Sequence, residues 1–235
     1  MAIRRELETP KGLQRRRRTP SPAQVQRNIE TRQKLIEAAA HVVGEHGYAG
    51  CSISRVTARA GVAHGAFYLH FKSQQDLFDV LLPEVSLGML AAIAQAVRGA
   101  ETLEDMERRG ITANIDYLVK NPFAYRAMYE ASHYAPKAFA RHNEIIMQGY
   151  TRSFRRLLGD KAPDQSQIDE LTAILVGARA YLYMRFSENG AEMKPLDPDL
   201  LDRYVSFVSA GMSEVLGVDA KARYQAFETA RTKTG

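Results

Sequence analysis

Acidic and histidine side chains with metal-ligand spacing occur at one place in the sequence. Glu130 and His133 have the E-x-x-H spacing that carboxylate-bridged metal sites use in helical bundles. Such a site also needs a second copy of the motif and two more glutamates on facing helices, and the sequence contains a single copy. His142 and Glu144 are the residues that could extend it to a mononuclear site. We interpret the pair as the polar end of a helix and predict no metal and no cofactor.

Motifs of other enzyme chemistries are absent from the sequence. It contains no G-x-S-x-G, no phosphate-binding glycine loop, no H-E-x-x-H and no cysteine cluster. Cys51 is the single cysteine, which excludes an intramolecular disulfide and is typical of a reducing compartment. We interpret it as a small residue packed at the start of a helix, and we predict no catalytic residues.

The stretch from 52 to 71, SISRVTARAGVAHGAFYLHF, predicts two short helices that meet at a tight turn. Ser52 can accept a backbone N–H bond as the N-cap of a helix over 53–60. Gly61 can take the left-handed conformation that ends this helix, and a second helix begins at about Ala63. Two helices joined in this way make a helix-turn-helix, whose second helix enters the major groove of DNA. A structural helical hairpin without a partner fits the same pattern.

The order and spacing of residues in this stretch resemble the N-terminal domain of the TetR (tetracycline-repressor-like) family of bacterial regulators. The resemblance rests on Gly47-Tyr48, A-R-A-G-V, G-A-F-Y-L-H-F-K-S and Asp76-Leu77, and it covers residues 29 to 80. It implies that three residues take the places of phosphate contacts and that three others lie near the bases. The implied phosphate contacts are Tyr68, His70 and Lys72, and the residues near the bases are His64, Gly65 and Ala66.

Three positions depart from the family pattern. Ala63 stands where a serine usually caps the recognition helix, and the missing cap costs about 1 kcal/mol. His64 stands where a lysine is usual, and Ala66 stands where a hydroxyl residue is more common. The last two differences affect how bases are read.

Basic charge is concentrated in the N-terminal third of the chain. The formal net charge is +5; residues 1–82 hold 13 Lys/Arg and 7 Asp/Glu, which gives +6, and the remainder holds 19 and 20, which gives −1. Binding to a polyanion requires such a distribution. Residues 1–21 are polar and predict a disordered basic arm, which either lies along DNA or is a solvated tail. The arginines of this arm that we predict to bind DNA are Arg15, Arg16, Arg17 and Arg18.

Start and stop signals after residue 21 predict helices throughout. Ser21-Pro22 begins a long first helix that Gly47 ends, and a helix from Ser73 continues to about residue 97. Pro83 should kink or divide that helix, either as a hinge or as a simple helix end. Further signals predict five more helices over 101–217. There is no apolar leader and no uninterrupted apolar stretch of eighteen residues, so we expect a soluble, cytoplasmic protein.

Two of these helices, over 164–187 and 198–216, carry more apolar surface than one core needs. Pairing their second faces across a two-fold axis gives a four-helix bundle and a homodimer, whereas in a monomer both helices would be central. The residues predicted at this dimer interface are Ile174, Gly177, Tyr181, Met184, Tyr204, Phe207 and Gly211.

The middle region, over 117–154, is rich in aromatic and Met side chains, which line apolar ligand cavities but also fill ordinary cores. The resemblance favours a cavity, because proteins of the TetR family bind a small molecule in this part of the chain. The predicted pocket residues are Tyr117, Phe123, Tyr125, Met128, Tyr129, His133, Tyr150, Phe154 and Tyr181.

Together these features predict an all-α protein with a helix-turn-helix three-helix domain at 22–72 and a helical ligand-binding and dimerisation domain at 73–231. We predict a homodimeric transcriptional regulator, a repressor that binds a palindromic DNA operator and is released by a small apolar or aromatic effector. A dimeric helical protein that binds nucleic acid non-specifically is the alternative, and an all-helical enzyme comes third. Selectivity for a two-fold symmetric site over random duplex separates the first two.

Overall fold

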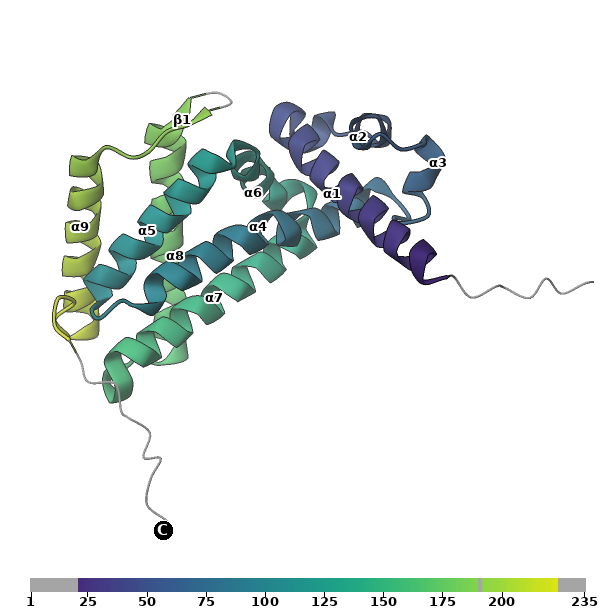
Figure 1. The fold of residues 1–235 in the computed structure, drawn as a ribbon. Helices are drawn as coiled ribbons and strands as arrows, with labels where there is room; N and C mark the ends of the chain where they lie inside the picture. The colour runs from purple at the N-terminus through teal and green to yellow at the C-terminus, as the bar shows by residue number, and fades with distance from the viewer. Residues whose placement is uncertain (1–20, 190–191, 224–235) are drawn as a thin grey trace, which may run out of the picture.

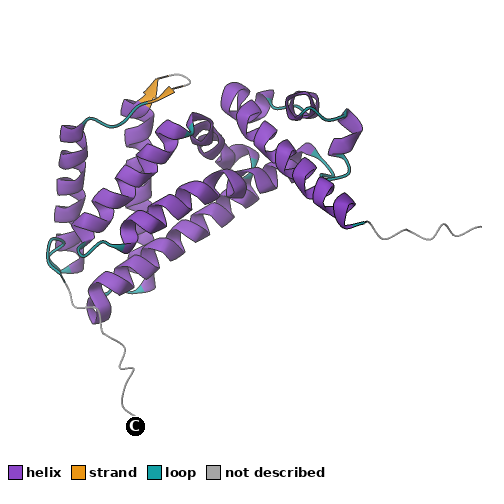
Figure 2. Cartoon of the chain, viewed as in Figure 1, coloured by secondary structure: helices purple, strands orange, loops and turns teal. Residues whose placement is uncertain are grey.

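The computed structural model describes residues 21–189 and 192–223, and helices make up nearly all of this part of the chain (Figures 1 and 2). The predicted basic arm, with Arg15 to Arg18, lies outside the described residues except for Ser21. The helices in chain order are α1 (Pro22–Gly50), α2 (Ile53–Ala60), α3 (His64–Phe67), α4 (Gln74–Arg98), α5 (Leu103–Lys120), α6 (Pro122–Tyr134), α7 (Pro136–Leu158), α8 (Gln165–Leu182) and α9 (Pro198–Leu216).

Local capping places the first three helices where the sequence predicts them. The Ser21 side chain accepts a hydrogen bond from the backbone of Gln24, and Pro22 occupies the first position of α1. Gly47 has φ 70°, so regular helix stops there and a further turn follows. Ser52 caps α2 by accepting from the Arg55 backbone, and Gly61 ends it in the left-handed conformation with φ 67°. We refer to α1–α3 as the helix-turn-helix unit.

The long helix α4 runs through the centre of a second unit, α4–α9 (Figure 1). It packs against α5, α6 and α7 and also contacts α1. Pro83 lies inside α4 and does not end it, so the helix is continuous and the predicted division is wrong. By length and composition α4 is apolar enough to cross a membrane, although it is not an uninterrupted apolar stretch. Core helices of soluble proteins meet the same test, and the packing of three helices against α4 accounts for its apolar character.

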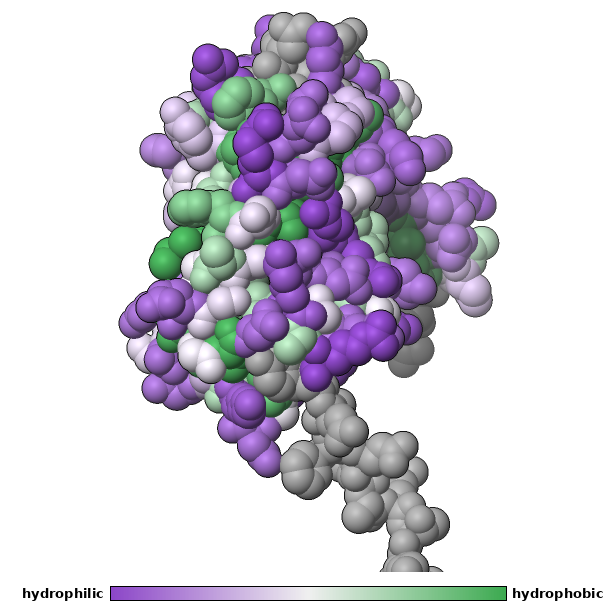
Figure 3. All heavy atoms as spheres, turned by 90° about the vertical axis from the view of Figure 1, so that its left-hand side faces the viewer, coloured by the Kyte–Doolittle hydropathy of each residue, from purple (hydrophilic) through white to green (hydrophobic). Residues whose placement is uncertain are grey.

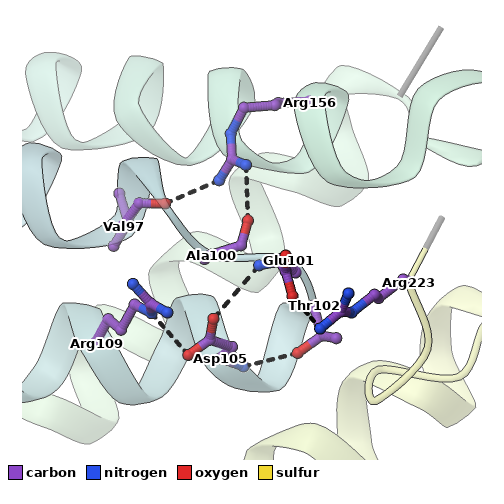
Figure 4. Close-up of polar contacts among 8 residues, drawn as sticks. All are labelled: Val97, Ala100, Glu101, Thr102, Asp105, Arg109, Arg156 and Arg223. Atoms are coloured by element: carbon purple, nitrogen blue, oxygen red, sulfur yellow. Dashed lines mark hydrogen bonds and ion pairs between the residues drawn. The ribbon is translucent and has the colours of Figure 1, made fainter. Parts of the chain in front are cut away.

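The turn between α4 and α5 is held by side chains from other helices (Figure 4). Arg156 of α7 donates to the carbonyl oxygens of Val97 and Ala100 at 2.9 and 2.8 Å. Such bonds satisfy carbonyls that lack partners at a helix C-terminus. Thr102 then caps α5 by accepting from the Asp105 backbone at 3.0 Å. The end of α4 that lies far from the helix-turn-helix unit is therefore fixed to α7.

Five α-helices occupy the described residues after α4, as the start signals predict. A π-helical segment, η2 (Tyr183–Ser187), and a short antiparallel hairpin of β1 (Glu188–Asn189) and β2 (Glu192–Met193) connect α8 to α9. A 3-10 turn, η1 (Gly159–Lys161), follows α7. Each strand has two residues, which is too short for the alternation that identifies strands in a sequence.

Candidate nucleic-acid interface and ligand cavity

The predicted recognition helix α3 is a single turn that presents small and polar residues to the surface. Ala63 is its N-cap and makes no side-chain cap bond, in agreement with the missing serine. His64 and Gly65 are exposed, and Ala66 is half-buried. Phe67 is completely buried and anchors the turn against the rest of the unit. Gly65 and Ala66 leave room for a DNA base edge to approach the backbone.

The predicted phosphate contacts lie after this turn, where Tyr68 and Lys72 are exposed. His70 is half-buried, and burial together with the positive charge of Arg32 lowers the pKa of its imidazole. At neutral pH His70 therefore offers a phosphate a neutral N–H donor and no positive charge. Ser52 is exposed as well, with its hydroxyl 3.3 Å from the backbone nitrogen of Arg55 that it caps.

A cavity of about 560 Å³ lies inside the second unit, between α4, α5, α6, α7 and α8. Its walls are mainly aliphatic, Met and aromatic side chains, which suits an apolar small molecule. Among the predicted pocket residues, the cavity is lined by Tyr125, Met128 and Tyr129 of α6 and Tyr150 of α7.

The other predicted pocket residues lie elsewhere because each helix turns a different face to its neighbours. Phe123 packs against the His41 ring of α1 at 4.7 Å, and Phe154 is completely buried in the core. The Tyr117 hydroxyl donates to the Val85 carbonyl at 3.3 Å between α4 and α5. His133 and Tyr181 are exposed and are not part of the cavity wall.

Residues of α4, α5 and α8 that the sequence reasoning missed complete the cavity wall. They include Met89 and Ile93 of α4, Met106 and Asn114 of α5, and Arg179 of α8. The sequence contains a signal for one of these residues, Arg179. Arg179 stands four residues after Leu175 on an apolar helix face, and a charge in that place indicates a buried partner.

That partner is Glu107 of α5, whose carboxylate is fully buried. It accepts from the Arg179 Nε and a terminal nitrogen at 2.8 and 2.5 Å, from the Tyr204 hydroxyl at 2.6 Å and from the Tyr150 hydroxyl at 3.4 Å. Burial, and next the negative charge of Glu107, raises the pKa of Tyr204. Tyr204 thus lies in the core of the protomer. The prediction that Tyr204 lies at the dimer interface is wrong, because its hydroxyl donates to the buried carboxylate of Glu107.

The remaining predicted interface residues form an uncovered surface on α8 and α9. The side chains of Ile174 and Phe207 are 64% and 80% exposed, and Tyr181 is exposed beside them. A Cβ added at Gly177 or Gly211 would meet no atom within 4 Å. Figure 3 shows apolar residues on the side of the molecule where α9 lies, between polar ones. Met184 is half-buried, and its sulfur lies 3.5 Å from the Tyr129 hydroxyl.

Helix α6 joins the cavity to the helix-turn-helix unit. Its residues Ala124, Ala127 and Ala131 are buried, and the helix packs against α1. A Cβ on Gly44 of α1 would lie 2.4 Å from the Cβ of Phe123, so only glycine allows this close approach. The opposite side of α6 carries the residues that line the cavity.

A carboxylate holds the two units together at this contact. Glu130 of α6 accepts from the Tyr48 backbone N–H at 2.8 Å and from Arg126 Nε at 2.7 Å. The Tyr48 hydroxyl donates to the Ala127 carbonyl at 3.1 Å, and its ring stacks on Tyr134 at 5.6 Å. Glu130 therefore connects α6 to the helix-turn-helix unit through its hydrogen bonds. Within the part of the chain that the structure describes, no three His, Cys, Asp or Glu side chains gather as a metal site would need.

Comparisons with known proteins agree with this geometry. The family described as bacterial regulatory proteins, tetR family, matches residues 35–81. The transcriptional activator FasR of Mycolicibacterium smegmatis is 24% identical over 79% of this chain and 84% of its own length. The fatty acid metabolism regulator protein of Bacillus subtilis is 39% identical over 51 residues, which cover 22% of this chain and 26% of that protein.

Solved structures show the same fold. A tetR-family regulatory protein from Rhodococcus RHA1 superposes with a TM-score of 0.58 at 20% identity and covers 82% of this chain and 98% of its own. The multidrug binding protein EbrR, solved with imidazole, superposes with a TM-score of 0.56 at 21% identity and covers 76% of this chain and 89% of its own. At these identities the likeness establishes the arrangement of helices.

The exposed ammonium group of Lys72 provides a test of the DNA surface. We expect Lys72→Ala to weaken binding to all duplexes alike and to reduce the slope of log K against log salt by about one, because one phosphate contact is lost. Fluorescence anisotropy over a salt series measures both quantities. Lys221→Ala is the matched control, since Lys221 is exposed and follows α9 in the second unit. A change in which sequence is preferred would assign Lys72 to base readout instead.

Proposed function

The chain belongs to the TetR family of bacterial regulatory proteins, and on that premise we propose that it is a ligand-responsive transcriptional repressor. As a homodimer it binds a palindromic operator through α2 and α3. A small apolar molecule in the cavity of the second unit then releases it from the operator. Members of this family are regulators and not enzymes, and we expect the protein in the cytoplasm.

The two-sided placement of α6 is the observation that carries this proposal. Three cavity residues, Tyr125, Met128 and Tyr129, and the Glu130 contact to α1 lie on the same two turns of helix. A ligand that displaces α6 must therefore also change the contact with the helix-turn-helix unit. Ligand and DNA then prefer different positions of α6, and each weakens the binding of the other.

The cavity walls support an apolar effector. Names among the relatives point the same way, since they include a fatty acid metabolism regulator and a multidrug binding protein. The relatives carry both activator and repressor names. We propose repression because ligand-induced loss of DNA binding then switches transcription on.

The uncovered surface of α8 and α9 supports the homodimer. Ile174, Tyr181 and Phe207 expose large apolar side chains on these two helices, and exposed apolar surface of this kind is typical of a protein interface. Gly177 and Gly211 allow a second pair of helices to approach closely. A two-fold dimer also matches the two half-sites of a palindromic operator, which lie about one helical turn of DNA or a multiple of it apart.

Selection of binding sites from a random duplex library tests the proposed function. We expect a two-fold symmetric sequence that binds about a thousandfold more tightly than random duplex at physiological salt. Electrophoretic mobility shift with the selected and a scrambled duplex measures this ratio. Equal affinity for both duplexes would support the alternative, non-specific binding of nucleic acid.

The Glu130 contact predicts how DNA release depends on α6. We expect Glu130→Ala to reduce the factor by which an effector weakens operator binding by about tenfold, because a charged hydrogen bond of roughly 1.5–3 kcal/mol is lost. Calorimetric titration of the effector into free and operator-bound protein gives this factor. Glu144→Ala, which removes an exposed carboxylate of α7, is the control. An unchanged factor in Glu130→Ala would show that the signal takes another path.

Gly177 provides a test of the dimer that does not disturb the protomer. Since nothing lies within 4 Å of an added Cβ, we expect Gly177→Arg to fold normally as a protomer. Burying its unpaired charge at an interface costs about 3–5 kcal/mol and should weaken dimerisation on the order of a hundredfold or more. Sedimentation velocity and circular dichroism measure assembly and folding, with Gln148→Arg on exposed α7 as the control. A folded Gly177→Arg protein that stays dimeric would place the interface elsewhere.

A further inference from the structure

The polar cluster beside the cavity, formed by Glu107, Arg179, Tyr150 and Tyr204, carries no net positive charge that would attract an anionic ligand. Glu107 accepts four hydrogen bonds, two from Arg179 and one each from Tyr150 and Tyr204. A carboxylate has about four lone-pair sites, so this one is saturated. The Arg179 guanidinium lines the cavity, but its positive charge is already neutralised by the carboxylate. The cluster therefore presents a charge-neutral wall to whatever enters.

Two polar atoms of the cavity wall remain without a protein partner. They are the hydroxyl of Tyr183, at the end of α8, and Nδ1 of His142 on α7. Both residues are 6% exposed and line the cavity, and among the residues that the structure describes neither atom finds a hydrogen-bond partner. Leaving a buried polar group unpaired is unfavourable, and a ligand that pairs with it gains affinity.

The interior therefore carries no unpaired positive charge. Burial lowers the pKa of His142 to about 4, so its imidazole is neutral at physiological pH. The phenol of Tyr183 is neutral too, because burial raises its pKa well above the usual value. A carboxylate that enters the cavity would lose its hydration without gaining an ion pair.

We propose that the cavity selects an uncharged, mainly apolar ligand whose polar group both accepts and donates hydrogen bonds; its oxygen accepts from the Tyr183 hydroxyl, and the same group bonds to His142 Nδ1. This inference rests on the proposed function in that it specifies the effector class of the same cavity. A neutral imidazole carries its proton on either nitrogen, so Nδ1 donates or accepts according to the tautomer. A primary amide or an alcohol satisfies both cases, since each of these groups donates and accepts.

Arginines at the rim define the competing arrangement, in which an anionic head stays outside and only the tail is buried. Arg98 and Arg152 are exposed and contribute to the cavity lining. Arg156, the third, is held by the carbonyls of Val97 and Ala100 (Figure 4). Water and salt screen exposed charges, whereas the unpaired atoms of Tyr183 and His142 are buried. The observations therefore favour recognition inside the cavity.

Three probes that share a ten-carbon alkyl chain and differ in the charge of the head group test whether the cavity selects a neutral ligand. They are decanamide, decanoate and decylammonium, titrated at pH 7 into the protein without DNA and followed by calorimetry. We expect decanamide to bind at least about tenfold more tightly than either charged probe, because the cavity offers hydrogen bonds without a counter-ion. Equal or tighter binding of decanoate would overturn the proposal, and so would failure of all three probes to bind.

Tyr183→Phe removes the hydroxyl and keeps the ring. We expect it to weaken decanamide about fivefold to tenfold, since one hydrogen bond is lost, and to leave the melting temperature unchanged or higher, since an unpaired buried hydroxyl is removed. Tyr181→Phe is the matched control, because Tyr181 is exposed on α8 and outside the cavity wall. A lower melting temperature for Tyr183→Phe would show that the hydroxyl has a partner within the protein and would overturn the proposal.

Removing the exposed arginines at the rim tests the competing arrangement, in which an anionic head group binds outside the cavity. We expect the double variant Arg98→Ala and Arg152→Ala to bind decanamide as the unsubstituted protein does. A loss of decanamide binding there, with Tyr183→Phe unchanged, would assign recognition to the rim and overturn the proposal. The selected operator duplex is titrated separately, so an effector with a charged head would leave the proposed regulator intact and remove only the neutral-ligand inference.

Discussion

The carboxylate of Glu130 satisfies the backbone at the point where α1 ends, and the attachment of the helix-turn-helix unit depends on this contact. The turn at Gly47 directs the next backbone N–H, that of Tyr48, away from α1. Glu130 accepts this N–H, and Arg126 binds both Glu130 and the Glu45 carbonyl. A buried backbone donor without a partner would be costly, so α1 and α6 are held in one relative position. The orientation of α2 and α3 follows from that position.

The composition of α6 reflects its two neighbours. Alanines at 124, 127 and 131 are small buried side chains of α6, and Gly44 on α1 allows Phe123 of α6 to approach closely. Large side chains at Tyr125, Met128 and Tyr129 fill the cavity wall. Helix α6 therefore packs tightly against α1 and also forms part of the cavity wall. Packed contacts resist small distortions and respond by shifting as units, which suits a helix that passes a signal.

Two further constraints surround the cavity. Arg156 fixes the C-terminal end of α4 to α7, and Pro83 leaves α4 continuous, so α4 spans from the cavity to the recognition turn as one element. The Glu107–Arg179 pair closes the side towards α9 through Tyr204. Such a buried pair contributes little net stability, but the loss of one partner leaves an unpaired charge in the core. Within the cavity, the pair contributes a polar wall without net charge.

Helices α8 and α9 each have one apolar face that is buried within the chain and one that is exposed. One face of each helix completes the protomer core, where Ile168, Leu175 and Val205 are buried. The opposite faces hold Ile174, Tyr181 and Phe207 in water in the isolated chain. A monomer gains nothing from exposing them, whereas a two-fold partner would bury both helices at once.

Local sequence signals are sufficient to predict the helix-turn-helix unit, the all-helical class and the start of each long helix. These features depend on local chemistry: the Ser52 cap, the left-handed Gly61 and the spacing of Val56 and Ala60 need no distant partner. Helical periodicity likewise predicted that α8 and α9 have two apolar faces. Periodicity identifies apolar faces, but it does not say which neighbour each of them meets.

Contacts between residues of different helices could not be predicted in this way. Phe154 and Tyr204 are as apolar and as regularly spaced as the residues around them. One fills the core and the other binds Glu107, because the packing of α7 and of α9 sets their orientation. Glu130 was interpreted as a polar helix end, since its partner Tyr48 lies 82 residues away. Contacts over such distances depend on how helices are rotated against each other, and that rotation is a property of the whole packed chain.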